Sequence, residues 1–183
     1  EDNQRGQKAG AILIGTRIDG AWVSERVAPA SLTERSRFGA SVAISDGVIA
    51  VGARNDSRWG ELAGQVWILE RSFGAWSVTQ QVAPPVPEPL GRFGSAVALD
   101  GDTLVVSSNS DEVEQGKVHV FRRDVDEGFV HVVTHLSGRD SDTRLFGSQL
   151  ALEGNMLAVS DIESEAVWLF SAPFTEAPAR LES

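Results

Sequence analysis

The feature that most constrains this chain is a sequence repeat with a period of slightly more than fifty residues. Three segments that begin with Phe-Gly align without gaps, and their Phe-Gly pairs lie 55 and 53 residues apart: 38–52, 93–107 and 146–160. Two further markers recur with the same period: 10–14, 64–68, 116–120 and a weaker copy at 166–170, and the aromatic-led segments 22–27, 76–82 and 129–136. A period of this length predicts a protein built from repeated supersecondary units.

Each repeat unit is predicted to contain four short strands. The Phe-Gly segment is interpreted as a β-hairpin, because its centre is Asp46-Gly47, Gly101-Asp102 or Gly154-Asn155. These residue types adopt the positive φ angles of two-residue turns. The flanking runs are apolar on both alternating faces, which is typical of strands covered on two sides. No apolar period of 3.6 residues persists between helix start and stop signals, so almost no helix is expected.

Four-stranded units of about 40–50 residues that are buried on both faces are typical of β-propeller blades. A sandwich does not repeat its sequence, a helical solenoid shows helical periodicity, and a β-helix uses a shorter repeat. We therefore predict an all-β chain with propeller-type four-stranded antiparallel blades, about three to three and a half of them. The predicted units are an N-terminal segment 1–9, the second half of a blade 10–28, complete blades 35–87 and 90–140, a partial blade 144–170 and a linker-like tail 171–183.

These units predict an incomplete ring. Propellers normally contain roughly four to eight blades, and an open arc exposes apolar blade faces and strand edges. We expect the propeller to be completed either by further repeats of a longer protein or by another subunit, which includes self-association.

The Phe-Gly start, the Ser41–Ala43 step, the tight turn and the segment Ala50–Ala53 resemble the FG-GAP repeat. This repeat builds the β-propeller of integrin α-subunits and of many bacterial exported proteins. The resemblance covers residues 38–170, and residues 10–28 as half of a preceding blade. It implies a secreted or cell-surface protein whose propeller loops bind a protein or a glycan.

The chain departs from the integrin pattern at the first hairpin of each repeat. Integrin-like repeats carry a calcium loop there, whereas this connection has only two central residues. Calcium takes roughly six to eight oxygen ligands, which a two-residue turn does not supply. The nearby acidic residues Asp46, Asp100, Asp102 and Glu153 are interpreted as turn formers. The chain therefore resembles a short, metal-free bacterial version of the repeat, and no metal or cofactor is expected.

Composition excludes several other classes of function. With 26 acidic residues against 16 Lys and Arg, the net charge is −10, so non-specific nucleic-acid binding is not expected. There are no cysteines, which rules out disulfides and thiol catalysis. No apolar stretch approaches the roughly 18–20 residues that span a bilayer. Gly-x-Ser-x-Gly and His-Glu-x-x-His motifs are also missing, so nothing indicates catalysis.

The three histidines do not form an obvious metal site. His131 and His135 share the face of one predicted strand, but they lie about 13 Å apart at 3.3 Å per residue. They therefore do not ligate one ion together. His119 is on the neighbouring strand and is interpreted, like the other two, as a polar residue of the outer blade.

One candidate binding loop connects the second and third strands of the first repeat. Trp59 has no counterpart in the other copies, and it lies close to Arg54, Asp56 and Arg58. A surface Trp beside Arg is typical of binding hot spots, and loops on rigid scaffolds carry function. The alternative is a Trp folded back over the edge of the blade.

A second candidate set consists of Arg37, Arg92 and Arg144. The first two directly precede Phe-Gly, whereas Leu145 separates Arg144 from it. Equivalent positions in a propeller lie at one end of the ring, so these residues are predicted to form a basic ring for carboxylate or sulfate groups. The alternative is ion pairing between blades with acidic loop residues such as Asp111, Glu112 or Glu163.

Three functions remain open at this point. The first is a non-enzymatic propeller module that binds a protein or glycan through its loops. The second is a structural module that assembles with another chain by strand addition. The third is part of an enzyme with its site at the mouth of the propeller.

Overall fold

A computed structural model describes residues 9–110, 115–136, 143–175 and 179–181 of the chain. The predicted segment 1–9, apart from Ala9, and the acidic residues 111–114 lie outside the described residues. Within the described residues all regular structure is β-strand and no helix occurs, so the all-β prediction is confirmed.

The strands form one hairpin and three four-stranded antiparallel sheets, in each of which the strand order follows the chain. The hairpin contains β1 (Ile12–Ile18) and β2 (Ala21–Val27). The first sheet contains β3 (Phe38–Ser45), β4 (Val48–Ala53), β5 (Gln65–Ser72) and β6 (Ala75–Val82). The second contains β7 (Phe93–Asp100), β8 (Thr103–Ser108), β9 (Lys117–Asp124) and β10 (Gly128–Leu136). The third contains β11 (Phe146–Glu153), β12 (Met156–Asp161), β13 (Ala166–Ser171) and β14 (Ala179–Leu181).

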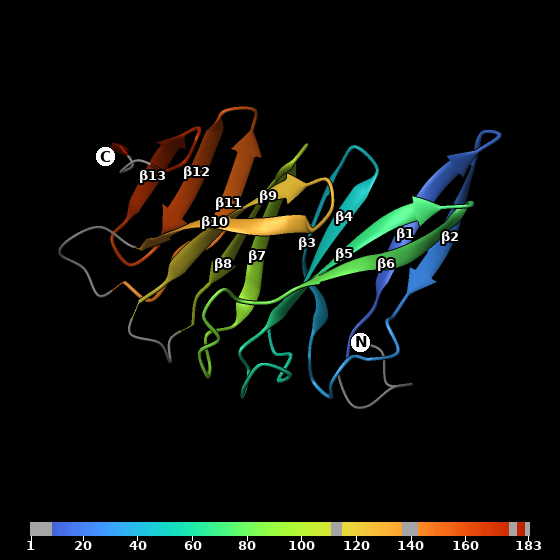
Figure 1. Cartoon of the computed structure of the whole chain (residues 1–183), viewed down its shortest axis with the longest axis horizontal. Coiled ribbons are helices and arrows are strands. Elements are labelled where there is room, and N and C mark those ends of the chain that lie inside the picture. Colours follow the sequence, from blue (N-terminus) through green and yellow to red (C-terminus); the bar gives the residue numbers. More distant parts are fainter. Residues whose placement is uncertain (1–8, 111–114, 137–142, 176–178, 182–183) are drawn as a thin grey trace.

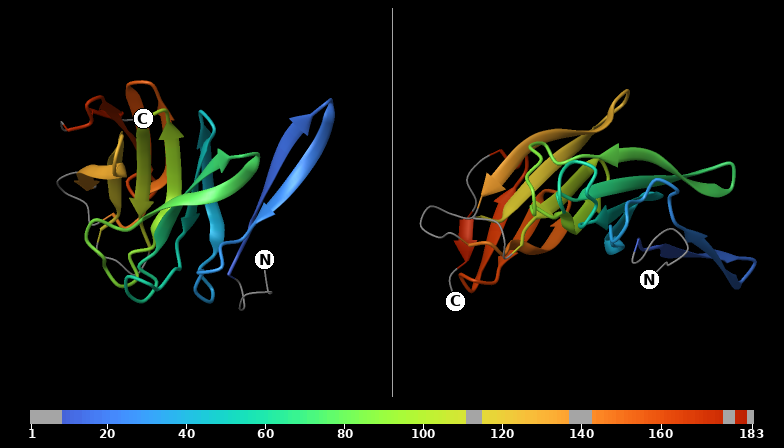
Figure 2. Two further views of the ribbon diagram at one scale, coloured as in Figure 1. Left: turned by 45° about the vertical axis from the view of Figure 1, so that its right-hand side comes forward. Right: turned by 90° about the horizontal axis from the view of Figure 1, so that it is seen from below.

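The sheets lie side by side in an open arc (Figures 1 and 2). The β1–β2 hairpin is at one end of the arc and the third sheet is at the other, so the sheets do not close into a ring. Each four-stranded sheet has the strand order of a propeller-type blade. The predicted blade architecture is therefore confirmed.

The third sheet differs from the sequence interpretation in one respect. β14 pairs with β13 through Val167↔Leu181, Trp168↔Arg180 and Leu169↔Ala179. This strand lies within residues 171–183, for which the sequence alone predicts a linker-like tail. The segment is too short and too rich in Ala and Pro to show a strand pattern of its own, and the edge of β13 supplies its pairing partner.

The first hairpin of each sheet turns within two residues, as the sequence predicts. Ser45 pairs with Val48, Asp100 with Thr103, and Glu153 with Met156. In the first of these turns Asp46 and Gly47 have φ angles of 47° and 77°. Both lie in the left-handed region that two-residue hairpin turns require.

Adjacent sheets are joined by close backbone contacts between a glycine and the Phe of the next Phe-Gly pair. Gly10 and Gly64 form parallel bridges with Phe38 and Phe93. A Cβ atom on Gly64 would lie 2.1 Å from the Phe93 carbonyl oxygen, and Gly64 has a φ of 85°. Only glycine fits such a joint without displacing the backbone.

The hydrophobic core lies between neighbouring sheets and not within one common centre. Val48 and Ala50 of β4 pack with Val97 and Leu99 of β7. Equivalent clusters lie between the hairpin and the first sheet and between the second and third sheets. Each four-stranded sheet is therefore covered on at least one face by its neighbour in sequence.

No helix that could cross a lipid bilayer is present in the part of the chain that the structure describes.

Candidate anion-binding site

Three arginines meet at the end of the sheets where the Phe-Gly strands begin. Arg37 directly precedes β3, Arg54 directly follows β4, and Arg92 directly precedes β7. β3 and β4 are antiparallel and Phe38 pairs with Ala53, so the start of β3 and the end of β4 lie together. The packing of β7 against β3 and β4 then brings Arg92 to the same place.

Arg37 and Arg92 have unusual backbone conformations for arginine. Their φ angles are 56° and 53°, in the left-handed region that non-glycine residues rarely adopt. In each case the carbonyl accepts a hydrogen bond from the amide three residues later, Ala40 at 3.0 Å and Ser95 at 3.1 Å. The repeated turn therefore fixes both side chains at the same position relative to their sheets.

The three guanidinium groups influence one another electrostatically. Partial burial lowers the pKa of Arg54, and the positive charges of Arg37 and Arg92 lower it further. Both causes disfavour the charged form. Arg54 remains a cation at neutral pH, but it is held in a place that repels positive charge and attracts an anion.

The cluster is only partly compensated by protein groups. Nη1 of Arg92 donates a hydrogen bond of 3.1 Å to Oδ1 of Asn55. Among the described residues, Arg37 and Arg54 form no ion pair. Two guanidinium groups are thus available to an external carboxylate or sulfate.

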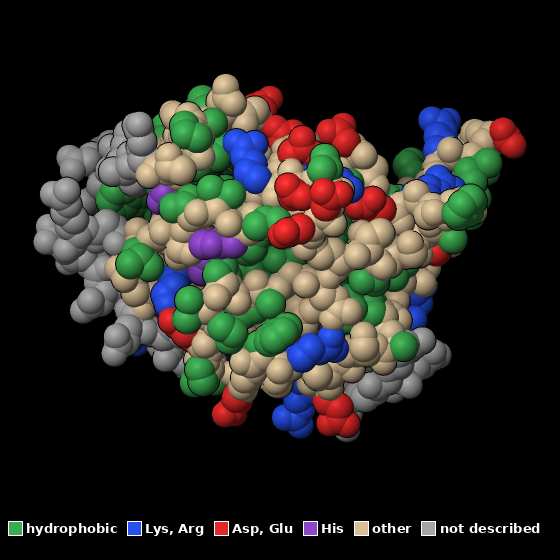
Figure 3. Space-filling model, viewed as in Figure 1, with side chains coloured by type: hydrophobic (Ala, Val, Ile, Leu, Met, Phe, Trp, Pro, Cys, Tyr) green, Lys and Arg blue, Asp and Glu red, His purple; other side chains and the backbone are tan. Residues whose placement is uncertain are grey.

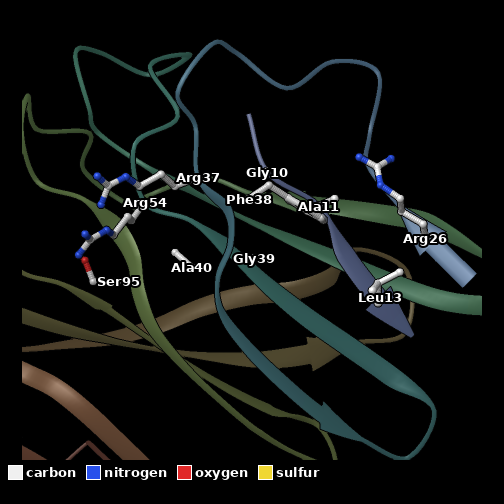
Figure 4. Close-up of a pocket in the computed structure, with 10 residues that line it drawn as sticks. All are labelled: Gly10, Ala11, Leu13, Arg26, Arg37, Phe38, Gly39, Ala40, Arg54 and Ser95. Carbon is white, nitrogen blue, oxygen red and sulfur yellow. The ribbon is translucent and has the colours of Figure 1, made fainter. Parts of the chain in front are cut away.

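Arg37 and Arg54 line a pocket of about 770 Å³ between the β1–β2 hairpin and the first sheet. Its other lining residues come mainly from β1, β2 and β3: Gly10, Ala11, Leu13, Arg26, Phe38, Gly39, Ala40 and Ser95. In Figure 4 the side chains of Arg37 and Arg54 extend in the same direction, and the tip of Arg54 lies next to Ser95. Leu13 and Arg26 lie at the opposite end of the pocket.

The structure does not give Arg144 the position of Arg37 and Arg92. The carbonyl that accepts the equivalent turn hydrogen bond belongs to Leu145, which receives the amide of Ser148 at 3.1 Å. The backbone amide of Arg144 instead donates to Oε2 of Glu163 at 2.5 Å. The inserted Leu145 thus moves Arg144 out of the repeated position.

Asp56 and Arg58 are used within the loop itself. Asp56 is completely buried, and its Oδ1 accepts a hydrogen bond of 3.0 Å from the amide of Arg58. Arg58 stacks over the Trp67 ring at 5.5 Å and donates to Gln81 Oε1 and the Ser31 carbonyl. These contacts position the loop, so they favour a structural role for both residues.

Trp59 lies at the surface of the same loop, where 45% of it is exposed. It makes no ring contact with another aromatic side chain among the described residues. The structure therefore places it beside Arg58 as an accessible apolar surface, not as part of a core cluster.

Sequence reasoning assigned Arg54 to the loop with Trp59 and not to the set containing Arg37 and Arg92. The pairing of β3 with β4 is the signal that places Arg54 beside Arg37. In an antiparallel hairpin the residue before the first strand lies beside the residue after the second strand. Arg26 and Ser95, which also line the pocket, carried no repeat signal that would have distinguished them.

Charge is divided between the two ends of the sheets. Six acidic residues lie in or directly beside the first two Phe-Gly hairpin turns and the β9–β10 turn: Asp46, Asp100, Asp102, Asp124, Asp126 and Glu127. Figure 3 shows acidic side chains gathered over this region. The arginine cluster lies at the other end of the same strands, so its positive charge is not cancelled by this acidic region.

Two of the histidines, His119 and His131, form a separate network in the second sheet, where both approach Thr134 Oγ1. Nε2 of His119 lies 3.1 Å from Ser108 Oγ, and its Nδ1 lies 2.9 Å from Thr134 Oγ1. Burial, followed by the charges of His131 and Lys117, lowers the pKa of His119 to about 3. His119 is thus a neutral, buried residue, which corrects its interpretation as an outer polar residue. Ser108 is buried as well, so this pair offers no accessible nucleophile.

Repeated Phe-Gly strands, two-residue turns and sheets that stack in an arc define a β-propeller-like repeat protein. The family described as FG-GAP repeat matches residues 28–69 and 76–121. These residues therefore carry FG-GAP repeats, and the resemblance drawn from the sequence is confirmed. A search of curated proteins finds no match for the chain.

Proposed function

We propose that this chain is a non-enzymatic binding module of an exported or cell-surface protein, and that Arg37, Arg54 and Arg92 bind an acidic group of a protein or glycan. The observation that carries the proposal is the cluster itself. Three arginines converge on one end of a chain with a net charge of −10, and burial and mutual repulsion lower the pKa of Arg54. An anion bound there relieves this repulsion.

The chemistry of the cluster suits oxyanions. A planar guanidinium group forms paired hydrogen bonds with a carboxylate, sulfate or phosphate group. The pocket beside Arg37 and Arg54 leaves room for the rest of a ligand, and Trp59 supplies an exposed aromatic ring on the loop that begins at Arg54. FG-GAP repeats are typical of extracellular proteins, which supports an exported location.

The test measures binding of two probes, a polyaspartate peptide and a sulfated oligosaccharide, with a neutral oligosaccharide for comparison. We expect the Arg37→Ala/Arg54→Ala variant to bind the acidic probes at least about tenfold more weakly, and higher salt to weaken binding by the parent protein. Arg71→Ala is the matched control, because Arg71 lies near the β5–β6 turn and donates to the Gly74 carbonyl.

Two results would overturn this proposal. One is equal affinity of the parent protein and the double variant for both acidic probes. The other is failure of the parent protein to bind either probe at low salt. A preference for polyaspartate over the sulfated probe, or the reverse, identifies whether the acidic group belongs to a protein or to a glycan.

The second candidate function is assembly with another chain, and one observation favours it. Val42 and Ile44 of β3 are exposed by 51% and 64%, although the equivalent side chains of β7 are buried in the core between two sheets. An exposed apolar sheet face of this kind marks a contact surface.

A further inference from the structure

We propose that Thr134 couples the exposed His131 to the buried His119, so that proton uptake by His131 reverses a chain of hydrogen bonds that ends at Ser108 in the core. The second sheet would thus contain a pH-sensitive switch of hydrogen-bond direction. This switch uses no residue of the arginine cluster, and it goes beyond the proposed binding function and does not depend on it.

Four side chains on three neighbouring strands form a continuous chain of short contacts. Oγ of Ser108, on β8, lies 3.1 Å from Nε2 of His119, on β9. Nδ1 of His119 lies 2.9 Å from Oγ1 of Thr134, on β10. Nε2 of His131, also on β10, lies 2.9 Å from the same oxygen. The Thr134 hydroxyl group is therefore shared between the two imidazole rings.

An irregularity in β10 brings these groups together. Residues three apart in a regular strand point to opposite faces of the sheet. The register of β10 against β9 shifts between His131 and Val133, and the extra residue of such a bulge turns the following side chains over. Thr134, which pairs with His119, thus points to the same face as His131. The rings of His119 and His131 lie on this face with their centroids 6.2 Å apart.

The two ends of the chain differ in their access to solvent. Ser108 and His119 are exposed by only 8% and 4%, whereas His131 is an exposed residue. Figure 3 shows histidine side chains at the molecular surface. Burial disfavours a charge on His119 and lowers its pKa to about 3. His131 is therefore the group that exchanges a proton with solvent near neutral pH, while His119 stays neutral.

The direction of the hydrogen bonds in the neutral protein follows from counting protons. A hydroxyl group has one proton to donate, and a neutral imidazole has one donor and one acceptor nitrogen. The His131 ring also forms a hydrogen bond with the Val133 backbone that raises its pKa, so the ring is the donor in that bond. Because Nε2 of His131 faces Thr134, Nδ1 is the nitrogen that carries this proton. Thr134 then donates to Nε2 of His131, Nδ1 of His119 donates to Thr134, and Ser108 donates to Nε2 of His119.

A second proton on His131 is incompatible with this direction. The charged ring donates from both nitrogens, so its Nε2 donates to Thr134 and the Thr134 proton turns towards His119. His119 accepts this bond only after it has released its Nδ1 proton and taken one at Nε2, from which it donates to Ser108. One proton enters from solvent, at His131, and the numbers of protons on Thr134, His119 and Ser108 do not change.

The charged and titratable groups around this chain leave His131 as the trigger. They are the ion pairs Lys117–Glu88 and Arg123–Glu70, and, beside Phe174, His135 and Arg122. Each ion pair compensates its own charge. The strands β8 and β10 contain no Asp, Glu, Lys or Arg. His131 and His135 are thus the titratable side chains of β10, and His131 is the one in contact with Thr134.

Nitrogen-15 NMR of the histidine rings tests the switch in the intact protein, because the ring shifts distinguish the two neutral tautomers from the charged form. Between pH 8 and pH 5 we expect His131 to become charged. His119 should stay neutral and change from the Nδ1–H to the Nε2–H tautomer with the same midpoint.

Variants at the coupling residue separate the switch from a general effect of pH. Thr134→Val keeps the side-chain shape but removes the hydroxyl, so His131 should still titrate while the His119 tautomer no longer follows it. Thr134→Ser keeps the hydroxyl and is the matched control, in which both changes should occur together. His131→Phe keeps a ring at the surface, removes the titrating group, and should leave His119 in one tautomer at all pH values.

Three results would overturn the switch. The first is a His119 ring that keeps one tautomer while His131 titrates in the parent protein. The second is a His119 response in Thr134→Val or His131→Phe that equals the response of the parent. The third is the Nε2–H tautomer of His119 at pH 8, which contradicts the assigned direction. The parent and Thr134→Ser spectra decide the first and third results even if a variant fails to fold.

Discussion

The rings of Phe38 and Trp67 meet edge to face, with centroids 6.1 Å apart and ring planes at 87°. Phe146 and Trp168 repeat this geometry at 6.5 Å and 85°. In the second sheet His119 takes the place of the tryptophan, 5.4 Å from Phe93. The Phe of each Phe-Gly pair is thus a core residue that ties the first strand of a sheet to the third.

The two kinds of tryptophan should respond differently to truncation. Trp67 is almost fully buried in the aromatic pair with Phe38, so Trp67→Ala is expected to cost about 3–5 kcal/mol of unfolding free energy. Trp59 is a surface residue, and Trp59→Ala should cost less than about 1 kcal/mol. Chemical denaturation of both variants measures this difference. A large loss for Trp59→Ala would show that it belongs to the core.

The joint between the first two sheets should not tolerate a side chain at Gly64. Gly64→Ala places a Cβ against Phe93 backbone atoms in a left-handed conformation, so we expect a loss of more than about 3 kcal/mol. Gly74→Ala is the control, because Gly74 has a similar φ of 87° in a turn with no atom within 4 Å of its Cβ. It isolates the conformational cost of about 1 kcal/mol. If Gly64→Ala and Gly74→Ala lower the free energy of unfolding equally in thermal or chemical denaturation, the close contact between Gly64 and Phe93 does not limit the side chain at position 64.

Stability should fall as the pH falls from about 6.5 towards 3. The folded-state pKa of His119 is about 3, whereas an exposed histidine in the unfolded chain titrates near 6.5. Between these values the unfolded state binds the proton and the folded state does not, so acid favours unfolding. Burial also lowers the pKa values of His131 and His135, which adds to the effect in the same direction.

Denaturation of the parent protein at pH 7.5 and at pH 5 tests this prediction, and His119 alone should account for roughly 2 kcal/mol of the difference. His119→Phe should reduce the difference between the two pH values. It should also lower stability at pH 7.5, because Ser108 and Thr134 lose a hydrogen-bond partner. An unchanged pH dependence in the variant would show that His119 is not the responsible group.

Calcium should not stabilise this protein. The first hairpin of each sheet turns within two residues, which leaves no loop to wrap an ion that takes roughly six to eight oxygen ligands. We expect the same Tm in millimolar calcium and in a chelator. A saturable increase of several degrees would reveal binding to the folded state and would contradict the turn argument.

The repeat and the turn residues were sufficient to predict the blades, because Phe38, Phe93 and Phe146 occupy the same core position and their hairpins use the same turn length. The site was harder to predict. Arg144 lies two residues before its Phe-Gly pair, whereas Arg37 and Arg92 lie one residue before theirs. Leu145 therefore occupies the turn position that Arg37 and Arg92 have in the other sheets. Arg54 joins Arg37 only through hairpin pairing, which is a relation across strands and not along the chain.

The sequence pattern also did not predict that His119, on the third strand of the second sheet, is buried. His119 looks polar in the sequence, yet it lies where Trp67 and Trp168 pack in the other sheets, and its two ring nitrogens find hydroxyl partners on Ser108 and Thr134. β14 was missed because strand pairing with β13 defines it, and three residues are too few to show alternation.

The main contacts between sheets run from each sheet to the next one along the chain. Each sheet is therefore stabilised mainly by its direct neighbours. Loss of order at one end therefore does not need to spread through the whole molecule at once. Among the described residues, the β1–β2 hairpin packs against the first sheet only. A protease or a pulling force should release it before the second sheet, which is held from both sides.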